Sequence, residues 1–242
     1  MKRALLAALL SALLLLTACG KADSPTPPDN TAETIPPVVE TPETPDVPET
    51  APAAEVTDLS RNGIEGSCNY AITVPQVQTG AAEADEIINS YYQNQAAKYQ
   101  DAAAAQDDGS VIAGYLVTYN AGHTLSILRT VNFNDSDTLC AETFNTETGM
   151  LYPADALFAE ENFSELLIAA VLDQLRDQNT DLFYQNWESL AATAFNKENF
   201  CLHRDGYCVF YQAGDLCDTE LQILIPWADL SGIAMPPEAD MM

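Results

Sequence analysis

The chain of 242 residues carries 36 Asp and Glu side chains against 9 Lys and Arg, which gives a formal net charge of −27. This excess of negative charge argues against nucleic acid as a ligand and against attraction to anionic lipid, because both would be repelled. The charge either serves solubility alone or speeds the encounter with a strongly cationic partner in a salt-dependent way.

The amino terminus has the parts of a bacterial secretory signal that ends in a lipobox. A basic start precedes an almost unbroken apolar run over residues 4–16, and Leu16-Thr17-Ala18-Cys19 follows with Gly20 behind it. The pattern predicts a signal peptide over residues 1–18, cleavage between Ala18 and Cys19, and a diacylglycerol on the Cys19 thiol. We therefore expect an extracytoplasmic protein, anchored to the cell membrane by lipid. The alternatives are a plain signal peptide or an uncleaved anchor, although the apolar run is short for a membrane span.

Residues 19–58 have a different character from the rest of the chain. They are rich in proline and acidic residues, and they contain no aromatic residue and no apolar periodicity. Proline disfavours helix and sheet, and acidic side chains repel one another, so the segment is predicted to be a disordered, partly polyproline-II tether. Such a tether would lift the following domain off the membrane. A proline-rich ligand motif is the other interpretation of this segment.

Residues 59–242 are long enough to form one domain with a hydrophobic core. Alternating patterns predict strands, 3.6-residue periodicity predicts helices, and Asp205-Gly206 is the strongest hairpin signal. The expected strands cover residues 68–75, 111–119, 124–133, 138–144, 200–204, 207–212 and 221–225, and the expected helices cover residues 81–105, 164–177 and 181–195. This order predicts the α+β class, with an antiparallel sheet, helices packed on one face, and a disordered linker in front.

The polar residues of the loops form no recognisable metal or catalytic constellation. His123 in a predicted turn and His203 in a hairpin strand lack partners at metal-ligand or triad spacing, so surface or packing roles are expected. Asp135 and Asp137 resemble alternating calcium ligands, but the EF-hand spacing and its closing Glu are missing, which favours a solvated turn. We therefore expect no metal, no cofactor and no catalytic residue.

Five cysteines follow Cys19, and an extracytoplasmic address would permit disulfides between them. A two-residue turn at Asp205-Gly206 would place Cys208 opposite His203 and Cys201 diagonally on the same face. The Cys201–Cys208 pair is then reachable, and Cys217 is a competing partner for either. Since the number is odd, at least one thiol stays free or pairs between chains. A zinc site lacks the paired short spacings, and reduced, buried thiols are the remaining alternative.

Four segments in the same order resemble the RsiV-type C-terminal domain, which also occurs beside PdaC-type polysaccharide deacetylases. The likeness covers roughly residues 65–235. It rests on Phe200-Cys201-Leu202-His203-Arg204-Asp205-Gly206-Tyr207 with Ile225-Pro226-Trp227, on Tyr119-Asn120 with Leu125-Ser126-Ile127, on Phe144-Asn145-Thr146-Glu147-Thr148-Gly149 with Leu157-Phe158, and on Ile72-Thr73-Val74-Pro75 with Ile88-Asn89.

This resemblance implies an extracytoplasmic binding domain. In RsiV, an anti-sigma factor, the domain binds lysozyme, and in PdaC it precedes the deacetylase domain. We expect neither a sigma-binding segment nor a deacetylase domain on this chain. The Gly-Gly-Ala-His-Gly segment common in the family is replaced by residues 132–138, so lysozyme binding is not carried over residue by residue.

The sequence thus predicts a non-catalytic, lipid-anchored binding module of the cell envelope. Its expected partner is a cationic muramidase such as lysozyme, or alternatively a cell-wall glycan, and a wall-acting enzyme is the least favoured interpretation. Core packing is the default for aromatic residues such as Tyr91 and Phe210, whereas an exposed aromatic cluster would stack on sugar rings.

Overall fold

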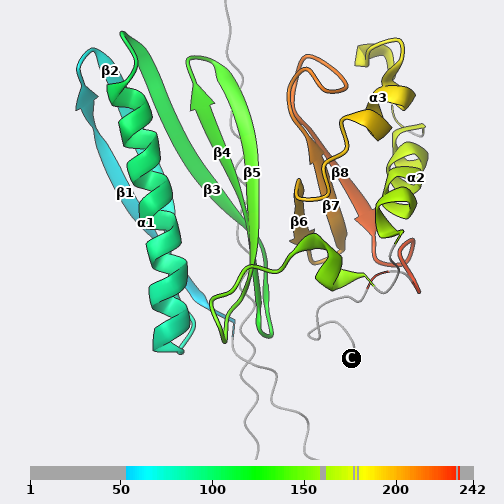
Figure 1. Ribbon diagram of the computed structural model, residues 1–242, viewed down its shortest axis with the longest axis horizontal. Helices are drawn as coiled ribbons and strands as arrows, with labels where there is room; N and C mark the ends of the chain where they lie inside the picture. Colours follow the sequence, from blue (N-terminus) through cyan, green and yellow to red (C-terminus); the bar gives the residue numbers. More distant parts are fainter. Residues whose placement is uncertain (1–52, 159–161, 177, 179, 233, 235–242) are drawn as a thin grey trace, which may run out of the picture. The chain divides into compact units, whose positions relative to one another are not determined.

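The computed structural model describes residues 53–158, 162–176, 178, 180–232 and 234 (Figure 1). These residues form strands and helices in a mixed arrangement, which confirms the predicted α+β class. In chain order the elements are β1 (Glu55–Glu65), β2 (Cys68–Gln78), α1 (Ala82–Ala104), β3 (Gly109–Ala121), β4 (Thr124–Phe133), β5 (Ser136–Asn145), the 3-10 helix η1 (Ala154–Leu157), α2 (Phe163–Arg176), η2 (Thr180–Leu182), α3 (Trp187–Thr193), β6 (Phe200–His203), β7 (Gly206–Tyr211) and β8 (Leu221–Pro226).

Strands β1 to β5 form one sheet whose spatial order equals the chain order. Neighbours are antiparallel except β2 and β3, which run parallel because α1 carries the chain back between them. Figure 1 shows α1 lying along one face of this sheet. On that face Ile88 and Tyr92 of α1 pack with Ile72, Leu125 and Ile127, and all five side chains are buried.

Strands β6, β7 and β8 form a second, antiparallel sheet. One face of it is covered by α2, through the buried side chains of Leu167, Val171 and Leu175, and by α3 through Ala191. The helix predicted over residues 164–177 is thus confirmed as α2. The structure adds that the strands divide into two sheets, each with helices on one face.

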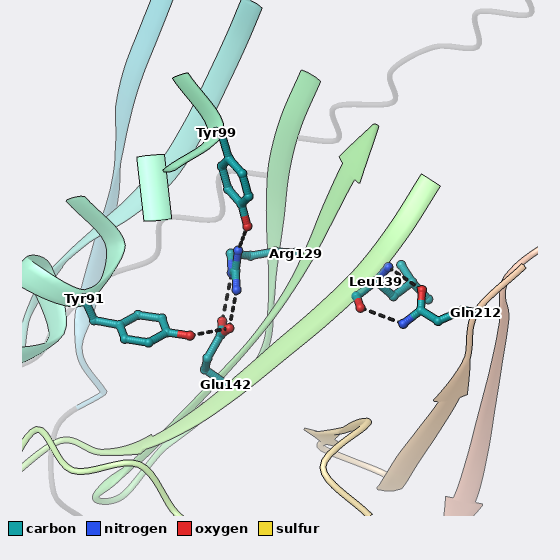
Figure 2. Close-up of polar contacts among 6 residues, drawn as sticks. All are labelled: Tyr91, Tyr99, Arg129, Leu139, Glu142 and Gln212. Carbon is teal, nitrogen blue, oxygen red and sulfur yellow. Dashed lines mark hydrogen bonds and ion pairs between the residues drawn. The ribbon is translucent and has the colours of Figure 1, made fainter. Parts of the chain in front are cut away.

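The two sheets meet where β4 and β5 lie against β6 and β7. Leu128 and Leu139 of the first sheet form a buried cluster with Cys201, Cys208 and Phe210 of the second. The side-chain amide of Gln212, just after β7, accepts a hydrogen bond from the Leu139 N–H at 2.9 Å and donates one to the Leu139 carbonyl at 2.8 Å (Figure 2). The Gln212 side chain therefore satisfies the backbone N–H and C=O of Leu139, which have no neighbouring strand to bond to at this edge of β5.

The folded part of the chain begins earlier than predicted. Residues 55–58, assigned to the tether from the sequence, belong to β1, where they pair in register with residues 75–78 of β2. The predicted signal peptide, the cleavage site at Ala18 and Cys19, and most of the tether lie outside the described residues. Within the described part, no helix combines the length and apolar character that a membrane crossing requires.

The turn of the hairpin near Asp205 lies one residue earlier than predicted, so each residue of β6 pairs two residues away from its predicted partner. His203 pairs with Gly206 and Cys201 with Cys208, so the turn residues are Arg204 and Asp205. A Cβ at Gly206 would lie 2.1 Å from the carbonyl oxygen of Ile225 in β8. The glycine is therefore required by the close approach of β8, and it does not form the turn itself.

Helix α3 is shorter than the predicted segment 181–195. It begins after Asn186 and ends at Thr193, and the separate 3-10 helix η2 precedes it. The apolar residues that suggested one long helix lie in different elements: Leu182 in η2 is exposed, whereas Ala191 in α3 is buried.

The Gln212 contact gives a test of how the second sheet is joined to the first. Replacing Gln212→Met keeps the side-chain length but removes both hydrogen bonds, so we expect the free energy of unfolding to fall by about 1–2 kcal/mol. Urea denaturation measures the change. The matched control is Gln222→Met on β8, an exposed position, for which we expect less than about 0.5 kcal/mol. Equal losses in both variants would contradict the assigned role.

Candidate functional site at the edge of the five-stranded sheet

A buried ion pair joins β4 and β5 beneath α1. Arg129 is 3 % exposed and Glu142 is 7 % exposed. The Arg129 Nε–H donates to Glu142 Oε2 at 2.9 Å, and the terminal Nη2 nitrogen donates to Oε1. Burial alone would lower the pKa of Arg129, but the hydrogen bonds and charge of Glu142 outweigh it and raise the pKa. The guanidinium is thus held charged, and each buried side chain depends on the other for compensation.

Two tyrosines of α1 complete this network, as Figure 2 shows. The Tyr91 hydroxyl donates to Glu142 Oε1 at 2.8 Å, and Arg129 donates to the Tyr99 hydroxyl and lies 5.8 Å from the centre of its ring. Burial, followed by the negative charge of Glu142, raises the pKa of Tyr91, so this hydroxyl stays protonated as a donor. The network therefore ties one helix and two strands to a single carboxylate.

The chain folds back on the free edge of β5 immediately after that strand. The Asn145 side-chain oxygen accepts the N–H groups of Glu147 and Thr148, and Gly149 has φ +71°. Residues 145–149 thus form a turn. A Cβ atom at Gly149 would lie 3.0 Å or less from atoms of Ala84 and Ile87 in α1. Glycine is therefore required for two reasons, the positive φ angle and the lack of space for a side chain.

The segment after this turn covers part of the β5 edge. The Asn145 N–H donates to the Met150 carbonyl, and the Tyr152 N–H donates to the Thr143 carbonyl, both at 2.8 Å. Gln212 covers the same edge at Leu139. Because outward-facing backbone groups recur at every second residue of a strand, the N–H and C=O of Ala141 also point toward this edge.

A pocket of about 310 Å³ lies at this part of the β5 edge. Aromatic rings from three parts of the chain line it, namely Tyr91, Tyr152 and Phe200, together with the backbone around Ala141. Two carboxylates complete the lining: buried Glu142, already compensated by Arg129, and exposed Glu198. An aromatic lining with a few convergent polar groups, together with a tyrosine whose pKa is raised, Tyr91, is typical of a ligand site.

Another hollow of about 380 Å³ lies beside α2 and is lined by Leu166, Ala170, Asp173, Gln174 and Asp229. It contains no aromatic ring and no buried charge among these residues. We therefore take the pocket at the β5 edge as the candidate site.

The structure places the polar residues singled out in the sequence away from this pocket's lining. The Nδ1 atom of His123 lies 3.5 Å from Glu147, and that of His203 accepts the Asp205 N–H at 3.2 Å. No group of three or more His, Cys, Asp or Glu side chains in the described part of the chain is arranged to hold a metal ion. Asp135 lies in the β4–β5 turn with φ +70°.

The three candidate disulfide cysteines do not come together as one group. Cys201 and Cys208 face each other directly across β6 and β7, where the sequence predicted a diagonal arrangement. Cys217 lies beyond β7, and its sulfur donates to the Thr219 carbonyl at 3.2 Å. The structure thus favours Cys208 over Cys217 as the neighbour of Cys201.

Sequence reasoning missed the ion pair, although one signal for it was present. Arg129 interrupts the core-facing positions of β4, which are otherwise occupied by Leu125, Ile127 and Val131. A charged residue at such a position requires a buried partner. The sequence offers many acidic candidates, so only the structure identifies Glu142.

The fold is similar to that of two solved DUF3298 family structures. A DUF3298 family member from Bacteroides fragilis NCTC 9343 matches with a TM-score of 0.57 and 14% identity, over 77% of this chain and 96% of that chain. A DUF3298 family protein from Pseudomonas aeruginosa PAO1 matches with a TM-score of 0.50 and 13% identity, over 76% and 95%. No family model and no curated protein matches the sequence. The chain therefore has the fold seen in these DUF3298 proteins.

The ion pair leads to a prediction about stability. Arg129→Met leaves the Glu142 carboxylate buried without its cation, so we expect the free energy of unfolding to fall by about 3–5 kcal/mol. Adding Glu142→Leu removes the stranded charge, and the double variant should recover most of the loss. Urea denaturation of wild type, both single variants and the double variant gives the coupling. Additive losses would show that the two side chains do not depend on each other.

Proposed function

We propose that this protein is a non-catalytic, lipid-anchored, extracytoplasmic binding module that captures a cationic protein, such as a lysozyme-type muramidase. The observation that carries the proposal is the aromatic, acid-containing pocket at the β5 edge. The lipobox that ends at Cys19 supports the lipid anchor. Mass spectrometry of the amino-terminal peptide tests the anchor: acyl chains on Cys19 would support it, and an unmodified Cys19 would contradict it.

The pocket suits a basic side chain from a partner protein. Among the aromatic residues of the lining, half-buried Tyr152 can offer a cation–π contact to a Lys or Arg, whereas Phe200 is buried and its ring is stacked on Tyr207. Glu198 offers a carboxylate that is not compensated by a buried cation, since its ion-pair neighbour is the exposed Lys197 at 3.8 Å. The net charge of −27 would steer a cationic protein toward the domain from a distance.

The fold is consistent with a binding module, but it does not identify the ligand. The DUF3298 proteins that share it are related to the RsiV-type C-terminal domain, the family that the sequence motifs resemble. Two of those motifs lie at the pocket: Leu151 and Tyr152, just after the motif that ends at Gly149, line one part of it, and Phe200, the first residue of another motif, lines a second part.

The test is a calorimetric titration of the full chain with lysozyme at about 50 mM and about 300 mM salt. We expect binding that weakens as salt rises, because screening shortens the reach of charge attraction. Glu198→Gln should weaken binding about two- to fivefold at the lower salt, the size expected for one exposed charge pair.

The matched control is Glu55→Gln, an exposed glutamate on β1 at the opposite edge of the same sheet. It changes the net charge by the same amount and should leave the affinity nearly unchanged. No binding at either salt would contradict the lysozyme proposal. Equal effects of the two variants would contradict the pocket as the binding site.

A second candidate ligand, a cell-wall glycan, is favoured by the same aromatic lining. Sugar faces stack on aromatic rings, and the outward-facing N–H and C=O of Ala141 would suit hydroxyl or acetamido groups. Titration with a soluble N-acetylglucosamine oligosaccharide tests this candidate. Binding that is insensitive to salt and lost in Tyr152→Ala would favour the glycan over the protein. Cleavage of the oligosaccharide would contradict the non-catalytic assignment.

A further inference from the structure

Cys201 and Cys208 are free thiols in the structure, and they occupy directly opposed positions on β6 and β7. The Phe210 N–H donates to the Asn199 carbonyl at 3.0 Å, and this bond flanks the neighbouring pair Phe200–Val209. Hydrogen-bonded and non-hydrogen-bonded pairs alternate along an antiparallel ladder, so Cys201–Cys208 is a hydrogen-bonded pair with a Cα separation of about 5.5 Å. Disulfides form over Cα separations of about 4.4–6.8 Å, which this pair satisfies, and over Cβ separations of about 3.5–4.5 Å. Opposed Cβ atoms of a hydrogen-bonded pair lie about 5.5 Å apart, so the bond requires the two Cβ atoms to approach by about 1 Å.

Both side chains point into the space between the two sheets. Cys201 and Cys208 are buried, and they pack with Leu128 and Leu139 of the first sheet and with Phe210 of the second. The two thiols share a hydrogen bond, which raises the pKa of Cys201 and lowers that of Cys208. A backbone hydrogen bond from Ile223 further favours the Cys208 thiolate, against the effect of burial.

We propose that Cys201 and Cys208 form an intrachain disulfide that crosslinks β6 to β7 beneath the first sheet. The reaction is thiol–disulfide exchange with a small-molecule disulfide or with the disulfide of a thiol oxidoreductase. The Cys208 thiolate attacks one sulfur of that disulfide and releases one thiol. Cys201 then loses its proton, attacks the Cys208 sulfur of the mixed disulfide, and releases the second thiol. Two protein thiols are oxidised and one external disulfide is reduced, so electrons balance.

The location predicts how the bond behaves once it is formed. A reductant reaches the sulfurs only where the two sheets separate, because Leu128, Leu139 and Phe210 surround them. The bond would therefore form as the hairpin folds, before the sheets pack together, and would resist reduction in the native protein. This proposal does not depend on the ligand of the β5 pocket.

The experiment is peptide mapping of the full chain after refolding from urea in the presence of oxidised glutathione, with the remaining thiols then blocked by N-ethylmaleimide in urea. Trypsin cleaves after Lys197 and Arg204, which separates Cys201 from Cys208. A disulfide therefore appears as a linked pair of peptides, one over residues 198–204 and one beginning at Asp205. Cys217→Ala leaves Cys208 as the only cysteine in the second peptide and makes the assignment unambiguous.

We expect the linked pair in wild type and in Cys217→Ala, and its loss in Cys208→Ala. In the native protein the link should persist in dithiothreitol and disappear when urea is added. Complete labelling of Cys201 by N-ethylmaleimide in wild type would overturn the proposal, and so would loss of the linked pair in Cys217→Ala. Thermal melts of both variants show whether they fold. The Cys217→Ala result decides the pairing even if Cys208→Ala does not fold.

Discussion

The buried pair of Arg129 and Glu142 is the interaction on which the arrangement of the first sheet depends. A charge in this position cannot be left alone, because transfer of an unpaired ion out of water costs several kcal/mol. The carboxylate of Glu142 therefore fixes where Arg129 lies, and the two tyrosines of α1 fix the helix over both. The packing of α1 on the sheet is thereby specified by directional contacts in addition to apolar burial.

The same carboxylate lies in the wall of the pocket and thus connects the core to the candidate binding surface. The pocket lies on the β5 edge between Gln212, which binds Leu139, and the returning segment, which binds Thr143 and Asn145. Natural proteins protect the edges of sheets from unwanted pairing. Here that protection leaves one stretch open, and aromatic rings surround it.

Local signals in the sequence were sufficient for most elements of the fold. The pattern over residues 124–133 predicted β4 with its observed bounds, and helical periodicity predicted α1 and α2 to within one residue at each end. Helices α1 and α2 bury one face each, so their periodicity is clear, whereas β4 is recognised by its run of apolar and β-branched residues and is buried on both faces. Strand β1 was missed because it is an edge strand whose side chains are exposed or only half buried, so alternation is weak there.

The features that sequence reasoning could not supply all depend on contacts between distant residues. The division into two sheets follows from which strands pair, and local patterns do not encode this. In the sequence, Gly206 suggested a turn. In the structure, the absence of a side chain at Gly206 leaves room for the carbonyl oxygen of Ile225 in β8. Tyr91 was assigned to the core, yet its hydroxyl binds Glu142 and its ring lines the pocket. The candidate site became visible only when β5, β6 and α1 were brought together.

Hydrogen exchange of the full chain with and without lysozyme, at low salt, tests the central claim most directly. If the β5 edge is the binding surface, amide exchange slows in residues 141–153 and 198–200 and stays unchanged in α2 and β8. Slower exchange confined to α2 and β8, or no change anywhere in the presence of saturating lysozyme, would contradict the account.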